Sequence, residues 1–193
     1  MNVFIFANHL TSININDLYL KAMLMDDDIG TTLRLHLISE RVVESWICAS
    51  CGYDSVFVNK KNPVKMDAID KINMAINMGF PAGAGRALQV LNALRNDIAH
   101  NPLKSSIPDS RIQSLAEITN NYLISSGWKP LKDLKAEIFD EQGKLQTTIT
   151  IESSCANRLK LCLIFSQILS AILELVVKEH PVIQLSKSQP ASS

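Results

Sequence analysis

Glycine and proline, the residues that most often interrupt helices, are scarce in this chain. It has seven of each in 193 residues, about 7% together, where an average protein has roughly 12%. This scarcity favours long helices over a turn-rich sandwich or barrel. With 47% hydrophobic residues, the chain has a globular rather than a disordered composition, and its length corresponds to roughly one domain. The sequence predicts a single, mainly α-helical domain over residues 1–185 and a disordered tail over residues 186–193.

Apolar residues recur at steps of three and four along most of the chain, which is the spacing of one helix face. The clearest case is residues 29–49, which follow the acidic run Asp26–Asp28 and stop near Gly52, a suitable C-terminal cap. The same spacing predicts helices over residues 18–25, 64–78, 86–100, 109–126 and 155–178. The sequence does not decide the conformation of residues 1–16. Two β-favouring runs on either side of Asp140–Lys144 predict a small β-hairpin near residues 136–151.

Two segments bear on where the protein acts. The first sixteen residues hold no Lys or Arg, so they lack the basic start of a secretory signal. Leu161–Val177 is apolar and close to the lower limit of a membrane span, ~17–25 residues. Gln167, Ser170 and Glu174 form a polar stripe along it, which favours a buried core helix instead. We therefore expect a cytoplasmic protein with no membrane partner.

The four cysteines do not form a metal-binding pattern. Cys48 and Cys51 make one C-x-x-C pair, whereas a structural zinc site needs four ligands, usually from two such pairs. Cys155 and Cys162 are two helical turns apart, which predicts that both are buried on one helix face. We expect reduced cysteines, no metal and no cofactor.

Charge is balanced overall but unevenly distributed. The chain has 19 basic and 19 acidic residues, which argues against a generic polyanion binder. Residues 17–57 hold seven acids and three bases, a net charge of −4, whereas residues 58–111 hold eight bases and four acids, a net charge of +4. The balance therefore leaves room for a focused anion site in the second segment.

The segment from Leu91 to Pro102 carries the most specific chemistry. Arg95 and His100 lie five residues apart, about 140° around an ideal helix. Pro102 ends the helix, which would let the imidazole of His100 swing back toward the guanidinium of Arg95. RNA cleavage needs a base for the ribose 2′-hydroxyl, an acid for the leaving 5′-oxygen and a cation for the phosphorane. Histidine supplies proton transfer and arginine clamps phosphate oxygens, without any metal.

The sequence of this segment, LNALRNDIAHNP, resembles that of the HEPN (higher eukaryotes and prokaryotes nucleotide-binding) superfamily. The family motif is an Arg, four to six residues and a His, often with a polar residue after the Arg; Arg95, Asn96 and His100 match it. Residues 71–79 resemble the helix and glycine that commonly precede the motif. The resemblance implies a HEPN-like antiparallel helical bundle that homodimerises. Many members are metal-independent endoribonucleases of toxin–antitoxin, abortive-infection or CRISPR-linked systems, with Arg and His from both subunits meeting at the dimer cleft.

Carried over to this chain, the resemblance implies that Arg95 binds the scissile phosphate of RNA and His100 transfers protons. Asn96, Asn101 and Glu40 are candidates to bind the phosphate or to support the pair. Asp97 is unfavourable beside such a site unless it points away or pairs with an arginine. An antitoxin protein is a possible partner. The alternative is a catalytically inactive HEPN-like module for RNA binding, protein interaction or dimerisation.

On the predicted helix over residues 29–49, Arg34, His36, Glu40, Arg41 and Glu44 mark a polar side. The pairs His36–Glu40 and Glu40–Glu44 are i,i+4 neighbours. We expect this side to be solvated; the other possibility is that one member faces the cleft, such as Glu40 orienting His100.

Overall fold

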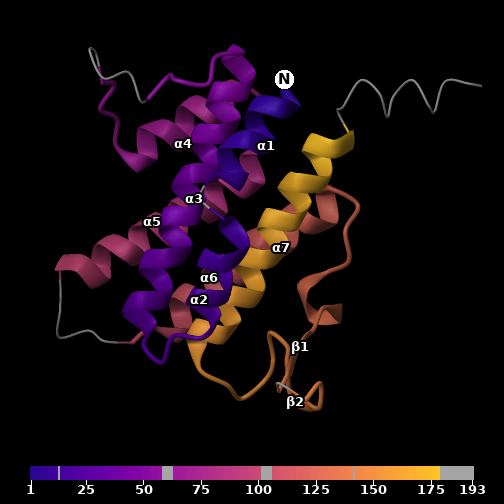
Figure 1. The fold of residues 1–193 in the computed structure, drawn as a ribbon. Coiled ribbons are helices and arrows are strands. Elements are labelled where there is room, and N and C mark those ends of the chain that lie inside the picture. Colours follow the sequence, from indigo (N-terminus) through magenta and orange to yellow (C-terminus); the bar gives the residue numbers. More distant parts are fainter. Residues whose placement is uncertain (13, 58–62, 101–105, 141, 179–193) are drawn as a thin grey trace, which may run out of the picture.

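The computed structural model describes residues 1–12, 14–57, 63–100, 106–140 and 142–178. These residues form seven α-helices, one short 3₁₀ helix and one antiparallel β-hairpin (Figure 1). The helices are α1 (Val3–Thr11), α2 (Ile15–Met23), α3 (Asp28–Cys51), α4 (Ala68–Asn77), α5 (Ala82–His100), α6 (Asp109–Ser125) and α7 (Asn157–Lys178). The 3₁₀ helix is Leu131–Asp133, and the hairpin strands are β1 (Ala136–Phe139) and β2 (Leu145–Ile149). The predicted mainly α fold and its small hairpin are confirmed.

Helix α3 is the centre of the bundle and packs against α1, α2, α4, α5 and α7. Its ends are set by the residues that the sequence singled out. The side chain of Asp27 caps the first turn by accepting a hydrogen bond from the backbone N–H of Gly30 at 2.5 Å. Gly52 ends the helix with a φ of 68°, in the left-handed region that glycine adopts without steric cost.

The core forms where α3 meets α1, α5 and α7. Trp46 on α3 is 2% exposed and makes edge-to-face contacts with Phe6 of α1 and Phe80. Leu161 and Ile164 of α7 are fully buried in the same cluster. Among the described residues, α7 is also the one helix long and apolar enough to cross a membrane, with a mean hydropathy of 2.0 and 56% of its most apolar window buried. Its buried side chains pack in the bundle.

Several element boundaries differ from the sequence prediction. Most of residues 1–16 is helical, because Asn2 caps α1 and Phe6 is drawn into the core. Helix α4 begins at Ala68 rather than at residue 64, and α5 begins at Ala82 rather than at residue 86. The prediction that Cys155 and Cys162 share a helix face is wrong, since α7 starts only at residue 157. The predicted tail over residues 186–193 lies outside the described residues.

Helices α4 and α5 pack closely against each other. A Cβ added to Gly85 would lie 2.6 Å from the Cδ1 of Ile76, so a larger residue there would require the Ile76 side chain to move. The C-terminal end of α5 projects from the bundle on the left of Figure 1. His100 is the last residue of that helix and is exposed to solvent.

Candidate functional site

A cavity of about 410 Å³ lies between α3, the start of α4 and the middle of α5. Its lining is mostly polar and comes from three separate parts of the chain. The lining residues are His36, Glu40, Met66, Asp67, Ala68, Ile69, Asn92, Arg95 and Asn96.

The position of each polar group follows from helical spacing. His36 and Glu40 are one turn apart on α3, and Asn92 stands one turn from both Arg95 and Asn96 on α5. The opposite side of α5 carries apolar residues such as Leu94, which is 2% exposed and packs in the core. The buried face of α5 therefore fixes the direction in which Arg95 points.

Arg95 is half-buried and its guanidinium is only partly satisfied. Its Nη1 donates a hydrogen bond of 3.0 Å to the Oδ1 of Asn96. Its Nε is buried and has no hydrogen-bond partner. Within the described part of the chain, Arg95 forms no ion pair with a carboxylate. A half-buried permanent cation with free N–H groups is suited to bind an anion with several oxygens.

His36 is the second cavity residue with an unsatisfied atom. The residue is 7% exposed, and its Nδ1 is buried without a partner. Its Nε2 lies 3.9 Å from the Oε2 of Glu40, which is too long for a hydrogen bond. Burial lowers the pKa of His36; Glu40 opposes this shift, while the charges of Arg95 and Lys71 add to it. The imidazole is therefore neutral near pH 7.

Glu40 belongs to an ion-pair network that extends away from the cavity. Lys71 of α4 donates to the Oε1 of Glu40 at 3.0 Å and to the Oε1 of Glu44 at 2.7 Å. Burial alone lowers the pKa of Lys71, but its hydrogen bonds to the two carboxylates outweigh burial and the net pKa is raised. The lysine therefore stays charged and neutralises Glu40.

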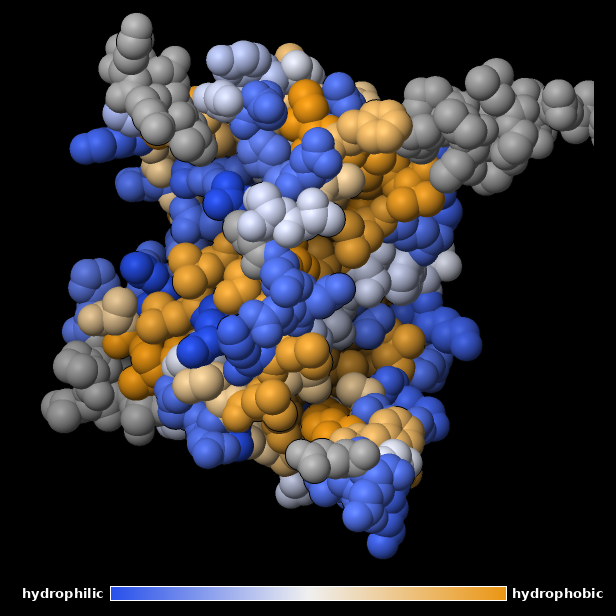
Figure 2. Space-filling view, viewed as in Figure 1, coloured by the Kyte–Doolittle hydropathy of each residue, from blue (hydrophilic) through white to orange (hydrophobic). Residues whose placement is uncertain are grey.

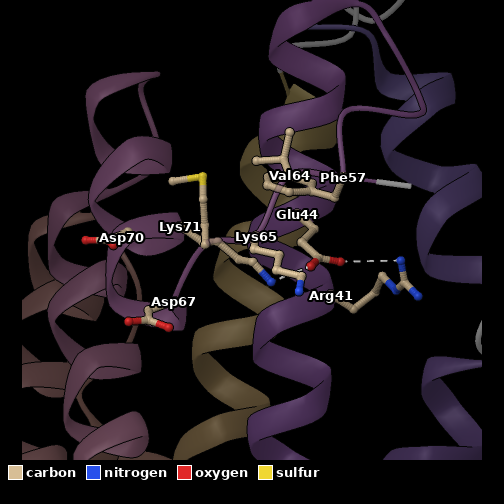
Figure 3. A pocket seen from close by; sticks show the side chains of 9 residues that line it. Arg41, Glu44, Phe57, Val64, Lys65, Asp67, Asp70 and Lys71 are labelled. Carbon is tan, nitrogen blue, oxygen red and sulfur yellow. Dashed lines mark hydrogen bonds and ion pairs between the residues drawn. The ribbon is translucent and has the colours of Figure 1, made fainter. Parts of the chain in front are cut away.

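Figure 3 shows the Lys71–Glu44 part of this network from a neighbouring cavity of about 510 Å³, where Lys71 reaches from α4 toward Glu44 on α3. On the other side of Glu44, Arg41 forms a 3.4 Å ion pair with Oε2. The Nζ of Lys71 also lies 5.5 Å from the ring centroid of Phe57. Met66 and Asp67 line both cavities, so the network borders the Arg95 site directly.

Asp97 does not compete for Arg95. Its Oδ2 accepts a 2.6 Å hydrogen bond from the Nη2 of Arg111 on α6, and Asp97 does not line the cavity. The arrangement that the sequence required for an anion site next to Arg95, an aspartate paired with another arginine, is present.

The structure brings together Arg95, Asn96 and Glu40 but does not add His100 to them. His100 ends α5, is exposed and does not line the cavity. No hydrogen bond joins it to Arg95 in the described residues. The predicted return of its imidazole toward Arg95 is not seen within the protomer, because α5 stays regular as far as His100 and keeps the two side chains on different sides. Asn101 lies outside the described residues.

Sequence reasoning missed His36 as a site residue, since it expected the polar side of α3 to be solvated. That expectation is wrong for His36, which is 7% exposed and lines a cavity together with residues of α4 and α5. Ser39 and Val43, on the same side of α3 as His36, are also buried. A buried face wider than the usual stripe indicates a helix with neighbours on more than one side.

The described residues contain no group of three or more His, Cys, Asp or Glu side chains placed to hold a metal ion. Cys48 is buried and Cys51 is exposed, and both are free.

The fold and the site define the class of this protein only broadly, as a mainly α-helical bundle with a polar cavity at Arg95, which forms no ion pair among the described residues. Comparisons with models of protein families, with curated protein sequences and with solved structures gave no match.

Proposed function

We propose that this protein is a metal-independent endoribonuclease of the HEPN type, of the toxin or phage-defence class, which cleaves RNA with paired Arg95 and His100 residues at a homodimer cleft. One observation supports the proposal most strongly. Of three buried side-chain atoms without a hydrogen-bond partner in the described residues, two belong to Arg95 and His36 in the same cavity. Buried polar atoms are rarely left unpaired unless a ligand or ordered water completes them.

A phosphodiester suits the Arg95 cavity. Its non-bridging oxygens accept hydrogen bonds, and its negative charge is matched by a guanidinium that has no acidic partner among the described residues. The hydrogen bond from Arg95 to Asn96 orients the guanidinium, which leaves the Asn96 amide N–H groups available to the same ligand.

The role of His100 requires a second protomer. His100 sits on the projecting, exposed end of α5, away from the Arg95 of its own chain. Leu33 and Leu37 on α3 are 37% and 57% exposed, three residues before and one residue after His36, and Ile69 at the cavity lining is 38% exposed. Figure 2 shows hydrophobic side chains reaching the surface at several places on one face of the molecule. The exposed pair Leu33 and Leu37, one turn apart on α3, favours coverage by another protein surface.

The cleavage test uses single-stranded RNA in EDTA. We expect the wild type to cleave it, and Arg95→Ala and His100→Ala to slow cleavage by roughly 10²–10³-fold, the usual loss for a group that stabilises or protonates the transition state. Arg86→Ala, which removes an exposed arginine of the same helix, is the matched control and keeps full activity. Loss of cleavage in EDTA, or full activity in both site variants, contradicts the proposal.

The second candidate function is a catalytically inactive HEPN-like module that binds RNA or a protein partner. The separation of His100 from Arg95 within one protomer favours it. It predicts an RNA gel shift without product, and loss of the dimer in Arg95→Ala on size-exclusion chromatography with light scattering. Cleavage products in the same gel exclude it.

A further inference from the structure

The proposed reaction needs both a base and an acid, and the cavity holds a histidine that the HEPN motif does not include. His36 comes from α3, outside the Arg95–His100 segment, and lines the same cavity as Arg95. We propose that His36 is the general base of the RNA cleavage reaction, that its Nε2 accepts the proton of the 2′-hydroxyl, and that the charge of Glu40 stabilises the imidazolium that forms. This inference rests on the proposed endoribonuclease function.

The geometry of the imidazole supports this assignment. Its Nδ1 is buried, so Nε2 is the ring nitrogen that a ligand in the cavity can reach. No hydrogen bond occupies Nε2 among the described residues.

The second carboxylate oxygen of Glu40 is placed to help His36 carry a proton. Lys71 holds Oε1 at 3.0 Å, which leaves Oε2 facing Nε2 of His36 at 3.9 Å. A carboxylate at that distance stabilises an imidazolium more than a neutral imidazole. Lys71 holds the other oxygen of the same carboxylate, so Lys71 and Glu40 together place a negative charge beside the base.

The surroundings also hold His36 in the form that a base needs. Burial and the charges of Arg95 on α5 and Lys71 on α4 lower its pKa, against the opposing effect of Glu40 on α3. His36 is therefore free to accept a proton at neutral pH. Asp67, at the start of α4, is the remaining charged group of the cavity lining and is exposed.

The complete step balances as follows. The 2′-hydroxyl proton passes to Nε2 of His36 while the 2′-oxygen forms a bond to phosphorus, and Arg95 binds the non-bridging oxygens. The bond from phosphorus to the 5′-oxygen breaks, and that oxygen takes a proton from the imidazolium of His100. The products are a 2′,3′-cyclic phosphate and a 5′-hydroxyl. His36 is left protonated and His100 neutral, and exchange with solvent restores both.

A substrate with a sulfur atom in place of the 5′-bridging oxygen distinguishes the role of His36 as the base from that of His100 as the acid. A thiolate leaves without protonation, so this substrate needs the base but not the acid. We expect His36→Asn to slow single-turnover cleavage in EDTA by roughly 10²–10⁴-fold on both substrates. His100→Ala should slow cleavage of the oxygen substrate only. The control is His9→Asn, which should cleave at the wild-type rate, because His9 contacts the backbone oxygen of Asp54 at 2.8 Å and does not line the cavity.

Two further measurements distinguish loss of the base from loss of folding or of RNA binding in the variants. Binding to the same RNA with a 2′-deoxy sugar at the cleaved position should be unchanged in His36→Asn, and added imidazole should restore cleavage by His36→Ala. A His36→Asn variant that cleaves like wild type, that recovers on the sulfur substrate, or that no longer binds the deoxy RNA overturns the base assignment. Absence of cleavage by wild type overturns the proposed function itself, and the base assignment with it.

Discussion

Replacing Lys71 with methionine tests the ion-pair network that supports the site. The lysine side chain is 12% exposed, and its partners Glu44 and Glu40 are 17% and 30% exposed. Breaking a buried pair costs about 3–5 kcal/mol, whereas an exposed pair contributes about 0–1 kcal/mol. For this intermediate burial we expect Lys71→Met to lower the free energy of unfolding by about 2 kcal/mol, which is roughly a 4–8 °C decrease in Tm for a chain of this size.

The assay is urea unfolding followed by circular dichroism at pH 7. Lys71→Met is measured in the wild-type protein and in the double variant Glu40→Gln/Glu44→Gln. In Glu40→Gln/Glu44→Gln, the lysine has no carboxylate to neutralise, so Lys71→Met should cost much less there. Lys21→Met is the matched control, because Lys21 is 60% exposed in its pair with Asp17 and should change stability by under about 0.5 kcal/mol.

The stability difference between wild type and Lys71→Met should depend on pH in one direction. The folded-state pKa of Lys71 is raised above its ordinary value of 10.5. The stability that its ion pairs contribute is therefore fully present below that pH. It is lost as the pH rises through the folded-state pKa. Wild type and Lys71→Met should therefore converge at alkaline pH. Equal losses in both carboxylate backgrounds, or a wild-type midpoint in Lys71→Met, refute this reasoning.

Three other outcomes are expected. Arg95→Lys should recover only part of the activity lost in Arg95→Ala, because an ammonium cannot make the two parallel hydrogen bonds of a guanidinium; equal rates for Arg95→Lys and wild type in the cleavage assay contradict this. The lowered pKa of His36 means that the unfolded chain binds the proton more readily, so stability should fall as the pH drops below about 6.5 and fall less steeply in His36→Asn, as measured by unfolding at several pH values. Gly83→Val should lower stability by roughly 1–3 kcal/mol, because a Cβ at that position would lie 2.8 Å from the Cβ of Tyr122; an unchanged unfolding midpoint argues against so close an approach of α5 and α6.

Helices with strong local signals were predictable from the sequence. Asp27 and Gly52 bracket α3 as capping chemistry requires, and α5 reaches His100 as its apolar spacing indicates. Local preference was a poor guide at the N-terminus. There the β-favouring run around Phe6 forms α1, because packing Phe6 against Trp46 outweighs intrinsic propensity.

The site was predictable only in part, because helical spacing defines the faces of one helix but not which other helix covers them. Arg95 and Asn96 could be found from their motif. His36 could not be distinguished from a solvated histidine until α4 and α5 were placed over it. The same limit applies to Glu40, whose partner Lys71 is 31 residues away in the sequence. The pairing of Asp97 with Arg111 likewise depends on α5 and α6 lying side by side.

The most direct test of the proposed chemistry is the end group that the protein leaves on RNA, identified by ³¹P NMR in the presence of EDTA. Attack by the 2′-oxygen on a phosphodiester bound at Arg95 predicts a 2′,3′-cyclic phosphate from wild type and none above background from Arg95→Ala. A 5′-phosphate product, or a cyclic phosphate formed equally by Arg95→Ala, contradicts the account.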